Sequence, residues 1–169
     1  MDGSNVALAR QVAVGVRYRG RPDVWIAEVA DLWLTVPRHY QDCPMSVFER
    51  GKQYSRKDIQ RELGGGVMDY LPHSGGAVVA GCFSKDLNPE APTVILPGTG
   101  PEIERWGRVF AEQPDPVPVF IKQRSNVWHC MGYFRCVTLA DDQATISEHA
   151  KRAGRTDVTM VLFLERDKS

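Results

Sequence analysis

The sequence lacks the features that would assign it to a membrane, a secreted or a metal-binding class. Its 169 residues contain no run of about 18 apolar residues, the length that crosses a bilayer. The N-terminus has no basic start followed by an unbroken apolar stretch, so we expect no secretory signal and a cytoplasmic protein. The four cysteines form no CxxC pair, so we expect buried thiols rather than disulfides or metal ligands at Cys43, Cys82, Cys130 and Cys136.

An excess of either charge is also missing. Lys and Arg together number 21, as do Asp and Glu, so the formal net charge is zero. Proteins that coat nucleic acid through many phosphate contacts carry an excess of positive charge. A protein that binds a specific nucleic acid stays compatible with the sequence, because basic residues cluster at 17–21, 50–61 and 122–124. A solvated mixed surface is the alternative explanation for these clusters.

The motifs of familiar catalytic centres are absent. HExxH, HxxxH and GxSxG do not occur, and PGTGP at 97–101 lacks the GK[ST] ending of a phosphate-binding loop. Pro101 favours a turn into a helix, whose N-terminus is an alternative site for a phosphate. A solvated turn explains the paired carboxylates Asp141 and Asp142. We therefore expect no cofactor, no metal and no catalytic residue; a metal-dependent nuclease whose carboxylates meet only in space stays open as an alternative.

Hydrophobic periodicity predicts helices first and strands afterwards. Apolar residues recur at helical spacing in residues 23–34. Ser55 followed by Asp58 resembles a capping box and predicts the start of a second helix. Three glycines from Gly64 onwards predict its end. Two further helices are expected at 100–113 and 145–152, and five strands at 77–83, 93–97, 117–122, 126–139 and 157–166.

Five short strands with few intervening helices predict an α+β fold. We expect a curved mixed β-sheet or a small β-barrel with flanking helices, not a doubly wound sheet. The expected organisation is a helical extension at 1–52, packed on the core, followed by one domain at 53–169. Docking of a partner by the extension, including formation of a homodimer, is the alternative.

Two stretches of the second half resemble a known family. PVPVFIKQRSNVWHCMGYFRCV at 116–137 and TDVTMVLFLERD at 156–167 are similar to the second half of an SRA (SET- and RING-associated) domain. SRA domains belong to the PUA-like group, whose members bind nucleic acid through a curved, barrel-like sheet. The block at 54–98 also resembles a module of bacterial modification-dependent restriction proteins. The chain departs from these patterns in three ways. Its thumb loop is shortened to QRSN, the SRA base-pocket stretch has no clear counterpart, and the HNH motif is missing.

The resemblance implies a protein that recognises a modified base in double-stranded DNA, with 5-methylcytosine first among the candidates. The implied setting is restriction of, or defence against, modified foreign DNA, with a separate nuclease subunit for any cleavage. Inspection of such a base requires flipping it out of the duplex, at a cost of a few kcal/mol. Stacking on aromatic rings returns about 1–3 kcal/mol per base. Binding of RNA by the same fold is the alternative.

The predicted base pocket combines aromatic rings with groups that bind a base edge. We expect Tyr70 and Trp128 to flank the base and Asp69 to bind its edge, with His73 in the same loop. The alternative places Trp128 in the core and Tyr70 at the end of the barrel. Six residues are expected to contact the nucleic-acid backbone: Arg56, Lys57, Lys122, Arg124, Ser125 and Asn126.

Overall fold

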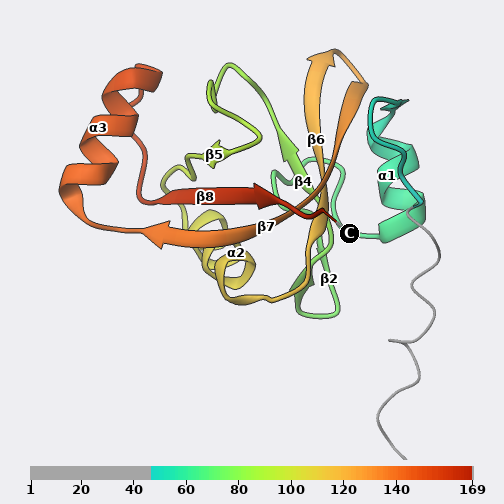
Figure 1. The fold of residues 1–169 in the computed structure, drawn as a ribbon, viewed down its shortest axis with the longest axis horizontal. Coiled ribbons are helices and arrows are strands. Elements are labelled where there is room, and N and C mark those ends of the chain that lie inside the picture. The colour runs from blue at the N-terminus through green and yellow to red at the C-terminus, as the bar shows by residue number, and fades with distance from the viewer. Residues whose placement is uncertain (1–46, 169) are drawn as a thin grey trace, which may run out of the picture. The chain divides into compact units, whose positions relative to one another are not determined.

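The computed structural model describes residues 47–168, which lie in a compact unit spanning Cys43–Ser169. The helix expected at 23–34 and Cys43 lie outside the described residues. The described chain contains three helices and eight strands, whose arrangement is shown in Figure 1. The helices are α1 (Arg56–Leu63), α2 (Pro101–Glu112) and α3 (Gln143–Ala153).

One mixed sheet contains six of the eight strands. Its order is β4 (Gly81–Phe83), β6 (Val117–Arg124), β7 (Val127–Ala140), β8 (Val161–Arg166) and β5 (Val94–Ile95), with β1 (Gln53–Tyr54) also paired to β7. β4 runs parallel to β6, and the other neighbours are antiparallel. A separate hairpin joins β2 (His73–Ser74) to β3 (Ala77–Val78). The sheet is curved and mostly open, which confirms the expected α+β class with flanking helices.

The 14-residue strand β7 organises this sheet, because it pairs with three other strands. Its first half lies between β6 and β1, and its second half pairs with β8. Register shifts interrupt both long ladders, and such irregularities bend a strand and increase its twist. The β6–β7 hairpin consequently rises beside α1, whereas the far end of β7 runs toward α3 (Figure 1).

Each helix covers one of three apolar clusters. Ile59 of α1 packs with Phe48 and Phe120. Phe110 of α2, the helix drawn below β7 in Figure 1, packs in the largest cluster. Ile146 of α3 packs with residues of β5 and β8. The amphipathic pattern of each helix therefore predicts the face that it buries.

Most of the expected elements are present, with three differences. The strand expected at 77–83 is interrupted between β3 and β4, where Val79 and Ala80 both donate to the carbonyl oxygen of Pro72. The last strand begins at Val161, and the segment before it contributes only an isolated bridge. α3 begins two residues before the expected start, because the Asp142 side chain accepts from the amide of Thr145 and caps it.

The described cysteines Cys82 and Cys130 are buried free thiols, as expected, whereas Cys136 is a free thiol that is only half-buried. Within the described residues, no helix has the length and apolar character needed to cross a membrane.

Candidate functional site

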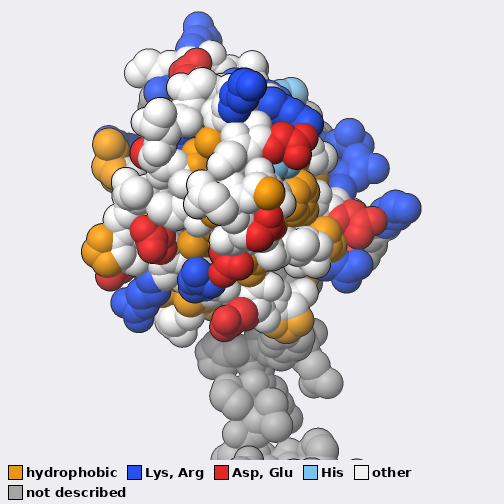
Figure 2. Space-filling view, turned by 90° about the vertical axis from the view of Figure 1, so that its left-hand side faces the viewer, with side chains coloured by type: hydrophobic (Ala, Val, Ile, Leu, Met, Phe, Trp, Pro, Cys, Tyr) orange, Lys and Arg blue, Asp and Glu red, His pale blue; other side chains and the backbone are white. Residues whose placement is uncertain are grey.

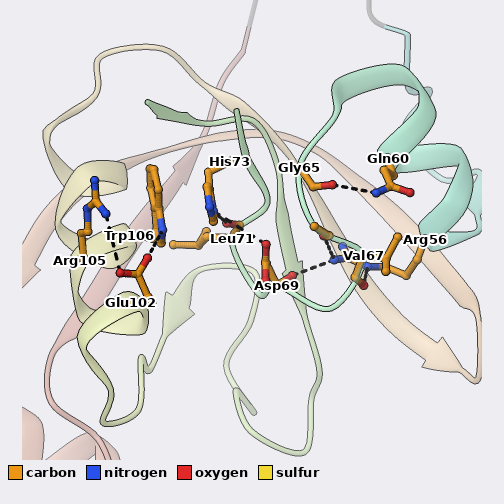
Figure 3. A network of polar contacts seen from close by, with 11 residues as sticks. Arg56, Gln60, Gly65, Val67, Asp69, Leu71, His73, Glu102, Arg105 and Trp106 are labelled. Atoms are coloured by element: carbon orange, nitrogen blue, oxygen red, sulfur yellow. Dashed lines mark hydrogen bonds and ion pairs between the residues drawn. The ribbon is translucent and has the colours of Figure 1, made fainter. Parts of the chain in front are cut away.

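The loop between α1 and β2 carries two of the residues predicted for the base pocket, Asp69 and Tyr70, and His73 is the first residue of β2. Figure 3 shows Asp69 and His73. The base of this loop is fixed to the sheet. The amide of Cys82 donates to the carbonyl oxygen of Tyr70 at 2.8 Å, and Leu71 is 1% exposed. The tip of the loop, at residues 66–69, therefore projects from a rigid support.

Arg56 fixes the tip of the loop from the first turn of α1. Its Nε donates to the carbonyl oxygen of Val67 at 2.7 Å, and its Nη2 donates to those of Gly66 at 2.9 Å and Asp69 at 2.8 Å (Figure 3). Arg56 is 9% exposed, and its guanidinium carbon lies 5.2 Å from the centroid of the Trp128 ring. The guanidinium is thus engaged within the fold, so we assign Arg56 to holding the loop rather than to a phosphate contact.

Asp69 and His73 lie next to each other in front of an aromatic ring of α2. The closest carboxylate oxygen of Asp69 is 3.9 Å from His73 Nδ1. The imidazole stacks on the indole of Trp106, with ring centroids 3.7 Å apart and 14° between the planes. His73 Nδ1 also lies 3.1 Å from the carbonyl oxygen of Leu71, and since a carbonyl only accepts, Nδ1 carries the proton of that hydrogen bond. Both Asp69 and His73 remain partly exposed.

The side chain of Trp106 is in turn held by α2. Its Nε1 donates to Glu102 at 3.1 Å, and the guanidinium of Arg105 lies 5.0 Å from its ring centroid. Figure 3 shows the resulting row of side chains, which runs from Arg105 on α2 through the loop to Arg56 on α1. Trp106 is only 8% exposed, so it is a core residue that also stacks on His73.

Tyr70 faces away from this row into the main core. Its ring contacts that of Phe83 at a centroid distance of 6.4 Å, and its hydroxyl donates to the carbonyl oxygen of Ile103 at 2.6 Å. Burial raises the pKa of the Tyr70 hydroxyl above its usual value. These contacts anchor the loop to α2, and stacking of Tyr70 on a base stays a prediction.

Trp128 lies on β7, with Tyr54 of β1 and Lys122 of β6 opposite it on either side. It packs against the cluster of Phe48, Ile59 and Phe120, and Arg56 covers its ring. The structure connects Trp128 to the loop through Arg56, which bonds to the backbone of Asp69, rather than placing it against Tyr70. Its expected position beside a flipped base stays a prediction.

The hairpin between β6 and β7 gathers four of the residues predicted to contact the nucleic-acid backbone. Lys122, Arg124, Ser125 and Asn126 are all exposed, and Asn126 has a left-handed φ of 56°, which asparagine tolerates in turns. Lys57 is exposed in the first turn of α1. No described carboxylate forms an ion pair with Lys57, Lys122 or Arg124.

The arrangement offers hydrogen-bond acceptors beside a stacked pair of rings. A carboxylate such as Asp69 accepts from the exocyclic amine of cytosine, and neutral His73 has an acceptor nitrogen at Nε2. Among residues 47–168, no group of three His, Cys, Asp or Glu side chains is placed to hold a metal ion. Burial raises the pKa of the Cys82 thiol to about 12, against the opposing effect of the nearby Arg56, so this thiol is not a reactive nucleophile.

Sequence reasoning missed two features of this site. Trp106 lies 33 residues from His73, and its helical spacing indicates only a core position. Arg56 belongs to a run of basic residues that indicates a surface. No local pattern marks either contact, because both depend on how the loop folds between α1 and α2.

No family model and no curated protein matches the chain. One solved structure is similar in fold, described as the SUVH5 SRA domain in complex with hemimethylated CG DNA. The TM-score is 0.51, the sequence identity is 13%, and the alignment covers 75% of this chain and 93% of the other. The chain therefore has an SRA-like fold.

Proposed function

We propose that this protein binds double-stranded DNA and recognises a modified base, with 5-methylcytosine first among the candidates, by flipping it out of the duplex. The observation that carries the proposal is the likeness of its fold to an SRA domain that binds hemimethylated DNA. That likeness covers 93% of the SRA chain and 75% of this chain.

The loop supplies the chemistry that the proposal requires. A flipped cytosine presents the donor amine of its Watson–Crick edge, and the Asp69 carboxylate, 3.9 Å from His73 Nδ1, is an acceptor for it. The carbonyl contacts of Arg56 hold that loop before any ligand binds, which reduces the ordering cost of binding. The exposed cations of the β6–β7 hairpin would then contact the DNA backbone.

The proposed setting is restriction of, or defence against, modified foreign DNA. In this proposal, recognition and cleavage are divided between subunits. A separate nuclease subunit would cut the DNA that this chain has bound.

Asp69→Ala, compared with the matched variant Glu112→Ala, tests the proposal. Glu112 is an exposed carboxylate in the last turn of α2. Wild-type protein and Glu112→Ala should bind a duplex with one 5-methylcytosine at least tenfold more tightly than the plain duplex. A hydrogen bond to a charged group contributes roughly 1.5–3 kcal/mol, so Asp69→Ala should lose about tenfold or more in affinity for the modified duplex.

Fluorescence anisotropy with labelled duplexes, at one fixed salt concentration, measures these affinities. Unchanged preference in Asp69→Ala would remove Asp69 from the site. Tighter binding of a structured RNA than of either duplex would contradict DNA recognition and favour RNA as the ligand.

A further inference from the structure

Two arginines from the two ends of the described chain meet on one edge of β7. The segment that contains Arg50 runs along this edge, where the amide of Gly51 donates to the carbonyl oxygen of Cys130 at 2.9 Å. The end of β8 occupies the next part of the same edge, with Arg166 opposite Phe134. Segments more than 100 residues apart in sequence thus lie on neighbouring parts of one edge.

The meeting point is Gly132. Its φ of 103° lies in the region that favours glycine, and a Cβ atom built there would stand 3.7 Å from Cδ of Arg50 and 3.8 Å from Cδ of Arg166. The stems of both arginines therefore pass over the space that the missing side chain leaves. Each guanidinium carbon lies two bonds beyond Cδ, so both heads can reach one anion.

Neither arginine of this pair has a carboxylate partner within the described part of the chain. Arg50 and Arg166 are exposed, and neither forms an ion pair with a described residue. Glu49, the carboxylate next to Arg50, is paired with Lys52 at 2.6 Å. The arginines of α2 and α3 differ, since Arg105, Arg108 and Arg152 each have a carboxylate partner. Figure 2 shows this mixture of acidic and basic side chains on the α3 side.

We propose that Arg50 and Arg166 form a clamp that binds a phosphodiester of the DNA backbone. This proposal rests on the proposed function and adds a second contact region to it. Two arginines whose stems meet over one residue suit phosphate, which accepts bidentate hydrogen bonds from arginine. Gly132 lies four residues along β7 from Trp128, roughly 13 Å at about 3.3 Å per residue. With Trp128 beside the base, as predicted, the clamp would contact the duplex at a point away from the flipped base.

The test compares Arg50→Gln, Arg166→Gln and the double variant with Lys151→Gln. Lys151 is an exposed cation of α3 for which the described residues provide no ion pair, so it is a matched loss of charge at a distant surface. The measurement is the affinity for one labelled duplex at salt concentrations from 50 to 200 mM. Each lost phosphate contact lowers the slope of log affinity against log salt by about 0.9.

The two arginines share one phosphate, so we expect the slope to be lower by roughly 1 in the double glutamine variant and by less in each single variant. The slope should be unchanged in Lys151→Gln and in Arg50→Lys with Arg166→Lys, which keep the charge. The ratio of affinities for modified and plain duplexes should stay that of the wild type. Slopes equal to those of the wild type in the double glutamine variant would overturn the clamp. A lower slope without any preference for a modified base would support the clamp and contradict base recognition. Absence of all DNA binding by the wild type would overturn both.

Discussion

Replacement of Arg56 by methionine should destabilise the protein far more than the same change at its neighbour Lys57. Arg56 is buried and bonds to three carbonyl oxygens of the loop, whereas Lys57 is exposed. Methionine keeps an unbranched apolar stem in both positions, so the comparison isolates the contacts of the guanidinium. The two substitutions also remove the same charge from adjacent residues of α1.

The magnitude follows from the contacts that are lost. Hydrogen bonds to charged groups contribute roughly 1.5–3 kcal/mol each, and a guanidinium over an indole ring adds about 0.5–2 kcal/mol. The desolvation of a buried guanidinium costs several kcal/mol in the wild type and offsets part of this gain. One nitrogen, Nη1, is buried without a hydrogen-bond partner in the described chain, which adds to that cost. We therefore expect a net loss of about 3 kcal/mol for Arg56→Met, and less than about 0.5 kcal/mol for Lys57→Met.

Urea denaturation followed by circular dichroism measures the free energy of unfolding of both variants. A loss of about 3 kcal/mol lowers the midpoint of unfolding without a change in the slope m. Hydrogen exchange of the amides at 64–70 provides a local readout, since these amides should exchange faster in Arg56→Met. Equal midpoints for the two variants would refute the assignment of Arg56 to holding the loop.

Three further predictions concern stability. Ser55→Ala should cost about 1 kcal/mol in a urea titration, because the hydroxyl of Ser55 caps α1. Hydrogen bonds from the Ser55 side chain and backbone lower the pKa of Asp58. The resulting contribution to stability is present above pH 3.8 and is lost as the pH falls through the pKa that Asp58 has in the folded protein. The midpoint of unfolding should therefore fall in acid less steeply in Ser55→Ala than in the wild type. Burial raises the pKa of the Cys82 thiol from 9.0 to about 12. The contribution of this thiol to the free energy of unfolding should therefore be fully present below pH 9, and the free energy should fall by up to about 1.4 kcal/mol per pH unit above it. Cys82→Ala should remove this part of the alkaline decrease, and an identical pH profile in that variant would contradict it.

Much of the fold could be predicted from the sequence because its signals are local. The capping box of Ser55 and Asp58 is present as predicted, and both of its hydrogen bonds form. Leu162 and Leu164 of the last strand, and Met160 just before it, are buried as the alternating pattern indicates. Pro101 stands at the start of α2, where its fixed φ and missing N–H suit the first turn.

The candidate site could be predicted only in part, because its contacts join distant segments. The run of basic residues in α1 gives no sign that Arg56 turns inward while Lys57 stays exposed. The stacking of His73 on Trp106 depends on the approach of β2 to α2, which neither segment encodes alone. The placement of Asp69 beside His73, four residues apart in the sequence, is the part that sequence proximity could indicate.

The measurement that tests the central claim most directly is the affinity of the purified protein for matched duplexes at one fixed salt concentration. The duplexes carry plain cytosine, 5-methylcytosine, 5-hydroxymethylcytosine or phosphorothioate linkages, with a structured RNA as a fifth ligand. We predict a preference of at least tenfold for a duplex with a modified base, which corresponds to about 1.4 kcal/mol. Equal, weak binding of all four duplexes would contradict recognition of a modified base.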